Sequence, residues 1–417
     1  MDGSCRASSL LTFEHALGVA AAATLASGLW LWAWGRRLPP GAARLAAAAP
    51  VVAINLLLPV LFCRWEQCTT ILLLSFNNSW IANFKALCWA VGRGALCMQH
   101  FTLPQFLAVY WTPITPAVSA PRPGTPAAAA KARSVAKAAA NGRSSNSSSA
   151  AGGVHAGKSD GGSHAGTGLP RRGSQGRLGE DAGGPGDMVA AFLGKHVFVL
   201  LLIYLLQFDL PGLVESFAWP CTHCCLSSWT APPLWFIGAT GLRVSPHFDR
   251  PWRSTSVASF WSKRWDLAAG NTLRQLVYES VVDGSLMAPP AGVPPARPSP
   301  ARQALGTAAT FAASGLIHEA IFWYITGRTT NGIWFAFFFI QAPLIFAERL
   351  ALSALKRRGI LLPDWLRTAI TTLLVVGTGQ YMFWLPAKRY GVTDCIVGNT
   401  RQAWLAILRR VGISLPI

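Results

Sequence analysis

The 417-residue sequence is poor in charge: Asp, Glu, Lys and Arg make up 13% of it, whereas hydrophobic residues make up 52%. Soluble domains usually carry about a quarter charged residues, so this scarcity argues against a soluble globular protein. Collagen-like, coiled-coil and wholly disordered chains are excluded by the same composition, because none of them is so rich in large apolar residues. The composition is that of a polytopic membrane protein.

Acidic residues are especially few, with 17 Asp and Glu against 36 Lys and Arg, which gives a formal net charge of +19. In a soluble protein this balance would suggest a nucleic-acid partner. Here the basic residues lie in short loops between apolar runs, which indicates the positive-inside bias of membrane proteins and an anionic membrane surface. We therefore expect no nucleic-acid partner. An anionic substrate such as a CoA thioester is the alternative source of this bias.

Cysteine is scattered and odd in number, with nine residues from Cys5 to Cys395. This pattern predicts no disulfide framework. The sequence Cys221–Cys224 contains a Cys-x-x-Cys, but a structural zinc site usually needs a second ligand pair, and none lies nearby. We expect membrane-proximal cysteines there, and no metal site in the protein.

Two uncharged runs, Ala16–Trp34 and Leu45–Cys63, are each 19 residues long. At 1.5 Å per residue such a helix covers about 29 Å, which matches the hydrocarbon core of a bilayer. Thr69–Val91 contains Asn and Lys and is either a span facing other helices or a half-buried interfacial helix. The remaining predicted spans are Met188–Phe208, Ala304–Thr326, Gly332–Leu352 and Trp365–Leu385. The stretch Leu213–Leu242 is broken by prolines and is ambiguous, with room for one short span around Trp229–Leu242. The sequence thus predicts an all-α membrane protein with seven or eight transmembrane helices.

Residues 112–187 consist almost entirely of Ala, Gly, Ser and Pro with scattered Arg and Lys. A segment with so few large apolar residues cannot form a core, so we predict a disordered loop. It divides the chain into an N-terminal transmembrane region, residues 1–111, and a C-terminal transmembrane region, residues 188–417.

Loop charge gives a partial topology. The loop Arg243–Arg302 carries eight Lys and Arg and is predicted to be cytosolic, whereas the loop after Thr326 carries only Arg328 and is predicted to be lumenal. The C-terminal tail then falls in the lumen although it is basic. Either this tail is an amphipathic helix on a membrane surface, or the number of spans is wrong.

The span Ala304–Thr326 carries His318 and Glu319 in SGLIHEAIFWYITGR, whereas most other strong spans have no ionisable residue near the middle. Ionisable groups in a membrane are costly and usually face an internal cavity. His318 is therefore either a functional residue or a histidine hydrogen-bonded to a neighbouring helix. Gly315 shares its helix face, which suits either a substrate passage or tight helix packing. Glu319 points elsewhere, toward an Arg or a polar group that it orients.

A second group of polar and aromatic residues lies in PHFDRPWRSTSVASFWSKRWDLAAGNTLRQLVYESVV. Ser254–Ser256 gives a helix-start signal, and Trp261 and Trp265 fall near one face of the helix that would follow. Taken alone, the segment is an amphipathic interfacial helix that anchors the membrane region. The alternative is a wall of a cavity that binds an acyl chain and its anionic head.

These two motifs resemble those of plant wax synthases in the membrane-bound O-acyltransferase superfamily. STSVASFWSKRWDL is similar to the FWxRRWN-type signature, and SGLIHEAIFWYITGR is similar to the histidine-bearing span. NNSWIANFKALCWAVGRGAL resembles the SWLANFK-type N-terminal segment, and GTGQYMFWLPAKR resembles the last-span region. The resemblance covers most of the chain outside residues 112–187, with a wax synthase-like domain at about residues 243–330.

The resemblance implies helices around an internal tunnel and transfer of an acyl group from acyl-CoA to a lipid alcohol, usually in the endoplasmic reticulum. His318 matches the catalytic histidine, and Asp266 stands where the signature has Asn. Substrate-binding residues are implied at the rest of that signature: Phe260, Trp261, Arg264 and Trp265. An ionised carboxylate cannot donate a hydrogen bond as an amide can. Asp266 would therefore act protonated, or it is ionised and paired with Arg264 or Lys263.

We therefore expect a long-chain-alcohol O-fatty-acyltransferase that makes wax esters, with acyl-CoA as co-substrate and no cofactor. His318 would act as general base. A sterol or a diacylglycerol would serve as acceptor by the same chemistry. A non-catalytic or transport relative is the alternative from another class, and the Asp at position 266 is the feature that favours it.

Overall fold

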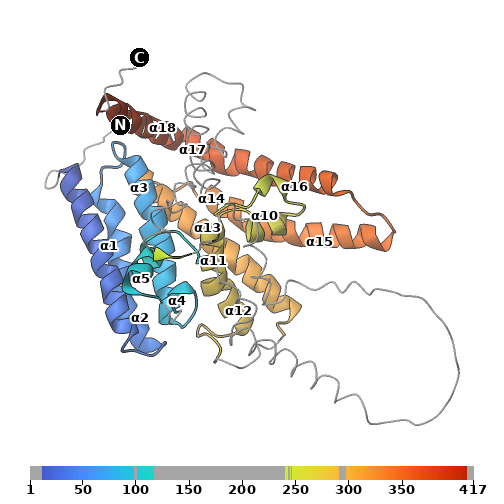
Figure 1. Cartoon of the computed structure of the whole chain (residues 1–417). Helices are drawn as coiled ribbons and strands as arrows, with labels where there is room; N and C mark the ends of the chain where they lie inside the picture. Colours follow the sequence, from blue (N-terminus) through green and yellow to red (C-terminus); the bar gives the residue numbers. More distant parts are fainter. Residues whose placement is uncertain are drawn as a thin grey trace, which may run out of the picture. The chain divides into compact units, whose positions relative to one another are not determined.

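The computed structural model describes residues 12–97, 101–116, 240–242, 245, 247–290 and 297–410. Over these residues the chain is helical and contains no β-strand (Figure 1). The predicted span Met188–Phe208, all but the last residues of Leu213–Leu242, the Cys221–Cys224 motif and residues 117–187 lie outside the described part. The all-α prediction is confirmed for the residues described.

The N-terminal region begins with two long apolar helices, α1 (Phe13–Gly35) and α2 (Ala42–Leu57), the second extended by the short helix η1 (Leu58–Leu61). A continuous helical stretch follows, made of α3 (Cys68–Leu74), the π-helical turn η2 (Ser75–Ala82) and α4 (Asn83–Ala90). The short helices η3 (Ala95–Cys97) and α5 (Leu103–Trp111) complete this region. Helix α2 packs along α4, and α1 packs against α5.

The C-terminal region carries η7 (Pro251–Arg253), α10 (Val257–Lys263), α11 (Leu267–Leu273), the π-helical turn η8 (Arg274–Tyr278) and α12 (Glu279–Asp283). The long helix α13 (Pro300–Thr326) follows and packs against α14 (Ile333–Phe339), which leads into α15 (Gln341–Arg357). The last elements are α16 (Asp364–Gly379), the π-helical turn η9 (Gln380–Trp384), α17 (Leu385–Arg389) and α18 (Val392–Arg410).

Three of the predicted spans form helices long and apolar enough to cross a membrane: Phe13–Gly35, Ala42–Leu61 and Ile333–Arg357. The predicted spans Thr69–Val91, Ala304–Thr326 and Trp365–Leu385 are helical too, but within the described part of the chain none of them combines the length and the apolar composition of a membrane span. The structure therefore supports a helical membrane protein, and the number of seven or eight spans stays a prediction.

The polar residues in the third predicted span face other helices. The Lys85 ammonium is buried and donates to the carbonyls of Val109, Thr112 and Ile114 at 2.6, 2.7 and 3.1 Å. Ile114 is itself buried, so the packed region continues to residue 116 and includes the first five residues of the predicted linker. Every donor of the ammonium thus finds a carbonyl, as a charge in such surroundings requires.

A disulfide joins Cys68, at the start of α3, to Cys395 in α18, with Cα atoms 6.4 Å apart. Cys63 is disulfide-bonded as well. The expectation of no disulfide framework is therefore wrong. Cys68 and Cys395 are 327 residues apart in the sequence. The spacing of cysteines along the chain does not reveal a pair that only tertiary packing brings together.

Replacing Cys68 by serine should lower the thermal unfolding midpoint in detergent by roughly 5–10 °C, because closing a long loop stabilises a protein by about 2–4 kcal/mol. Cys395→Ser should give the same shift, and the double variant should not be less stable than either single one. A double variant that unfolds at the wild-type temperature would show that the bond contributes nothing.

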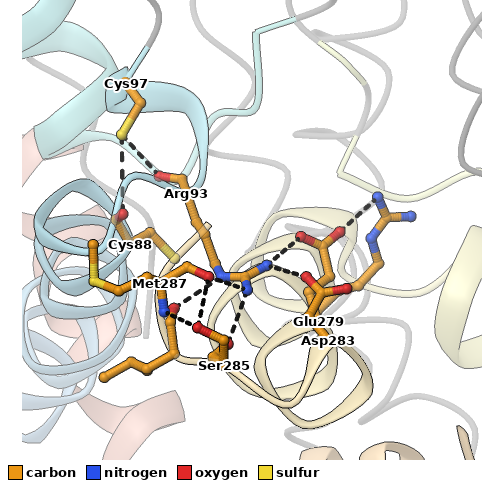
Figure 2. Close-up of polar contacts among 9 residues, drawn as sticks. Cys88, Arg93, Cys97, Glu279, Asp283, Ser285 and Met287 are labelled. Carbon is orange, nitrogen blue, oxygen red and sulfur yellow. Dashed lines mark hydrogen bonds and ion pairs between the residues drawn. The ribbon is translucent and has the colours of Figure 1, made fainter. Parts of the chain in front are cut away.

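Arg93 fastens the turn after α4 to the end of α12 (Figure 2). Its guanidinium is buried and donates to the carboxylates of Glu279 and Asp283 at 3.4 and 3.0 Å. The other donors are used by the backbone carbonyls of Ser285, Leu286 and Met287. All five N–H groups of the side chain are thus occupied, which marks Arg93 as a structural residue.

The thiol of Cys97 lies beside this arginine and donates to the Arg93 carbonyl at 3.2 Å (Figure 2). Burial raises the pKa of the Cys97 thiol to about 11. The group is therefore a neutral thiol near pH 7, and it behaves as part of the packing rather than as a nucleophile.

Candidate active site

His318 lies on α13 and is enclosed by aromatic side chains from several elements. The Phe338 ring of α14 stacks on the imidazole with centroids 3.9 Å apart. Trp80 of η2 and Phe383 of η9 approach it edge to face at 5.2 and 5.8 Å. Trp334 lies 6.3 Å away and itself stacks on Phe383. Residues far apart in the sequence thus converge on one histidine.

Hydrogen bonding fixes the state of the imidazole. Nδ1 of His318 lies 2.7 Å from the carbonyl oxygen of Ser314, one helical turn earlier. A carbonyl can only accept, so Nδ1 carries the proton, and the neutral ring has its lone pair on Nε2. No described residue hydrogen-bonds to Nε2. This nitrogen can therefore take a proton from a bound molecule.

Gly315 on the same face serves helix packing. A Cβ at this position would lie 2.9 Å from both the Cα and the carbonyl oxygen of Phe335 on α14. Backbone atoms cannot yield as a flexible side chain can, so α13 and α14 approach closely only because residue 315 is glycine. Of the two interpretations of Gly315, the structure selects tight packing.

Glu319 orients the start of α14. Its carboxylate accepts from the backbone N–H groups of Thr330, Trp334 and Phe335 at 2.9, 3.1 and 3.3 Å, and from the Thr330 hydroxyl. A carboxylate at a helix N-terminus is stabilised by the helix dipole and by these free donors. Glu319 therefore positions the helix that carries Trp334 and Phe338, and within the described residues it pairs with no arginine.

The second motif does not form a single amphipathic helix, which corrects that prediction. Ser256 caps α10 by accepting from the Ser259 N–H at 3.0 Å, as the helix-start signal indicated. The helix then ends at Lys263, because Asp266 has φ 36° and ψ 66° and starts α11 in a new direction. Asp266 caps that helix, since its Oδ1 accepts from the Ala269 N–H at 3.1 Å.

Asp266 pairs with neither Arg264 nor Lys263. Arg264 instead donates to the carbonyls of Asp249 and Arg250 at 3.0 and 3.4 Å. The side chain nearest to Asp266 is His247, whose Nδ1 lies 3.5 Å from Oδ1 without forming a hydrogen bond. Helix α11, which Asp266 caps, packs against α13, which carries His318, so the two predicted catalytic residues lie on neighbouring helices.

Aromatic residues of the second motif connect it to His318. Phe260 stacks on Trp265 with centroids 5.2 Å apart, and Trp261 contacts both. Trp261 also lies 5.9 Å from Phe338, the ring stacked on His318. Its indole N–H is held by Gln341 at 3.1 Å, and Glu348 of α15 accepts from the first N–H of α10 at 3.0 Å. Three of the predicted substrate-binding residues thus cluster, whereas Arg264 fastens a loop.

Sequence reasoning gave no site role to Trp80, Trp334, Phe338, Phe383 or His247. Trp80 lies in the predicted helical segment Thr69–Val91, which was also noted for its resemblance to other proteins. It stands on a π-helical turn, as does Phe383. Such turns are frequent at functional sites, but the hydrophobic pattern of a sequence does not reveal them.

Replacing Asp266 tests its two roles. Asparagine keeps an acceptor for the Ala269 N–H and tolerates a left-handed backbone, so Asp266→Asn should accumulate as the wild type does. Asp266→Ala should unfold more easily, by about 1–3 kcal/mol, because it loses the cap and keeps the strained backbone. Per folded molecule, Asp266→Asn should turn over more slowly, because the charge near His318 is gone. Thermal unfolding and acyl transfer in matched membranes measure the two effects separately.

Comparison with known proteins gives one family match and several relatives. Residues 244–340, which contain Asp266 and His318, match the membrane bound O-acyl transferase family. Acyl-CoA–sterol O-acyltransferase 1 of Arabidopsis thaliana is 26% identical over 364 residues, 86% of this chain and 86% of that protein. The long-chain-alcohol O-fatty-acyltransferase of Simmondsia chinensis is 28% identical over 222 residues, 49% of this chain and 56% of that protein.

A probable long-chain-alcohol O-fatty-acyltransferase 7 of Arabidopsis thaliana is 34% identical over 110 residues, 26% of this chain. That match covers 30% of the relative. The chain thus spans about a third to a half of these two long-chain-alcohol acyltransferases and most of the sterol acyltransferase. The resemblance inferred from the motifs is confirmed.

Proposed function

Because this chain is a wax synthase-like protein of the membrane-bound O-acyltransferase superfamily, we propose that it transfers a fatty acyl group from acyl-CoA to a long-chain alcohol. The observation that carries the proposal is the hydrogen bonding of His318, which leaves the Nε2 lone pair free. Its Nδ1–H is held by the Ser314 carbonyl, so Nε2 offers a lone pair inside an aromatic enclosure. An apolar enclosure suits two substrates with alkyl chains.

The reaction needs few groups. Nε2 of His318 takes the proton of the acceptor hydroxyl as general base. The acceptor oxygen attacks the thioester carbonyl, and a carbon–oxygen bond forms. The carbon–sulfur bond then breaks, and the CoA thiolate takes the proton from the imidazolium. Asp266 stabilises the imidazolium by its charge, because an opposite charge nearby favours the protonated ring.

The disulfide suggests how the protein lies in its membrane. Disulfides persist in oxidising compartments such as the endoplasmic reticulum lumen, so the end that carries Cys68 and Cys395 faces the lumen in our proposal. Arg64, near this end, donates to the Tyr324 carbonyl at 3.3 Å, next to the loop after Thr326. That loop was predicted to be lumenal from its charge, so both arguments agree. Helix α18 then lies on the lumenal side. This position favours, of the two alternatives for the basic tail, an amphipathic helix on the membrane surface.

The test is an assay of membranes containing the protein with labelled palmitoyl-CoA and three acceptors: hexadecanol, a sterol and a diacylglycerol. We expect labelled wax ester from hexadecanol. Sterol ester as the main product would support the second candidate, a sterol O-acyltransferase, which the 86% coverage of the Arabidopsis relative favours. No ester from any acceptor, with normal accumulation of the protein, would contradict both and leave the non-catalytic relative.

A further inference from the structure

Trp80 contacts His318 but has no part in the reaction as described above. It lies on the π-helical turn η2, is 3% exposed, and meets the imidazole edge to face with centroids 5.2 Å apart. The ring therefore belongs to the wall of the site. Its N-terminal position in the chain separates it from the two motifs that carry His318 and Asp266.

The indole N–H of Trp80 is buried and has no hydrogen-bond partner among the described residues. The other two tryptophans near the histidine differ in this respect. Trp334 donates to the Phe383 carbonyl at 2.9 Å, and Trp261 donates to Gln341 at 3.1 Å. An indole N–H can only donate, and burying it unpaired is costly. The ring that carries this unpaired donor contacts the imidazole, which indicates a ligand that supplies the missing acceptor.

We propose that the Trp80 N–H donates a hydrogen bond to the carbonyl oxygen of the acyl thioester and stabilises the negative charge that forms on it. This inference rests on the proposed function. Of the reacting atoms, the acceptor hydroxyl gives its proton to His318, whereas the carbonyl oxygen gains charge and needs a donor. When the tetrahedral intermediate collapses, an electron pair on the oxygen forms the carbonyl double bond again. The carbon–sulfur bond breaks, and the negative charge leaves on the thiolate. A neutral donor in a dry site is effective, because no water competes for the bond.

Trp80→Phe removes the N–H and keeps a ring against His318. Loss of one such donor typically costs about 10²–10³ in kcat, so we expect a fall in kcat of that order, with little change in KM for the acceptor. Trp30→Phe is the matched control. It removes the indole N–H of Trp30 on α1, which donates to the Ala47 carbonyl of α2 at 2.8 Å. This variant should keep the wild-type kcat.

Two unreactive analogues locate the bond without turnover. One is an S-alkyl-CoA thioether, which lacks the carbonyl oxygen; the other is a ketone analogue in which a CH₂ group separates the sulfur from the carbonyl. The wild type should bind the ketone about five- to tenfold more tightly than the thioether, the worth of one hydrogen bond. Trp80→Phe should bind both equally, and Trp30→Phe should keep the preference.

A Trp80→Phe enzyme within threefold of the wild-type kcat would overturn the proposal. So would a low kcat combined with an intact preference for the ketone, because the ring alone would then account for the loss. If the wild type makes no ester from any acceptor, the proposed function fails. The two analogues still report whether the Trp80 N–H meets a carbonyl oxygen, so the two failures can be told apart.

Discussion

His318→Ala should lower ester synthesis by about 10²–10⁴-fold while the protein still accumulates in membranes. The magnitude is that typical of losing a general base, which is the role that we propose for His318. His318 is also packed against Phe338 and Trp80, so alanine opens space that affects stability. His318→Gln fills more of that space and can still donate to the Ser314 carbonyl, but it cannot act as a base. Both variants should be inactive, and the glutamine variant should be the more stable.

The measurement is ester formation from labelled acyl-CoA, divided by the amount of folded protein. His15→Ala is the matched control, since His15 lies in the exposed first turn of α1 and bonds only to the neighbouring Thr12. It should retain the wild-type rate. Activity above a tenth of the wild type in His318→Gln would remove this residue from the mechanism.

Arg93→Ala should destabilise the protein by about 3–5 kcal/mol, which is the cost of breaking a buried ion pair by removing one partner. The substitution leaves the carboxylates of Glu279 and Asp283 without their shared cation, and it removes the Arg93 donors from three backbone carbonyls (Figure 2). Arg93→Lys should recover only part of the loss, because an ammonium keeps the charge but cannot reproduce the planar fork.

An exposed ion pair provides the control for this prediction. Arg367 lies 3.3 Å from Asp364 on α16, with the aspartate side chain 81% exposed. Such surface pairs contribute about 0–1 kcal/mol, so Arg367→Ala should barely change thermal unfolding in detergent. If Arg93→Ala and Arg367→Ala lowered the stability of the protein equally, burial of the Arg93 ion pairs would not be the cause of their contribution.

The sequence predicted helix α13 well, since the expected span Ala304–Thr326 lies within Pro300–Thr326. His318 could be singled out from the sequence, because an ionisable residue in an apolar helix is visible without any structure. The cap at Ser256 was equally visible, since serine before an apolar run is a local signal. These features depend on neighbours within a few residues. The outcome for Gly315 was open, because choosing between a passage and tight packing needs the position of Phe335.

The break at Asp266 could not be predicted from periodicity. Tryptophans at 261 and 265 fit one helical face, yet the backbone turns left-handed between α10 and α11. The aromatic enclosure of His318 was hidden for another reason. Trp80, Phe338 and Phe383 come from three elements far apart in the sequence, and each resembles an ordinary apolar residue of a membrane helix.

The bond between Cys68 and Cys395 makes the chain a closed covalent ring in which 327 residue steps separate the two cysteines. A single peptide cut anywhere within this ring, including the long glycine- and alanine-rich segment, opens the ring and releases no fragment. The two halves that carry Trp80 and His318 stay one molecule after such a cut. A protease that cuts the chain once between Cys68 and Cys395 therefore cannot separate the two halves until the disulfide is reduced.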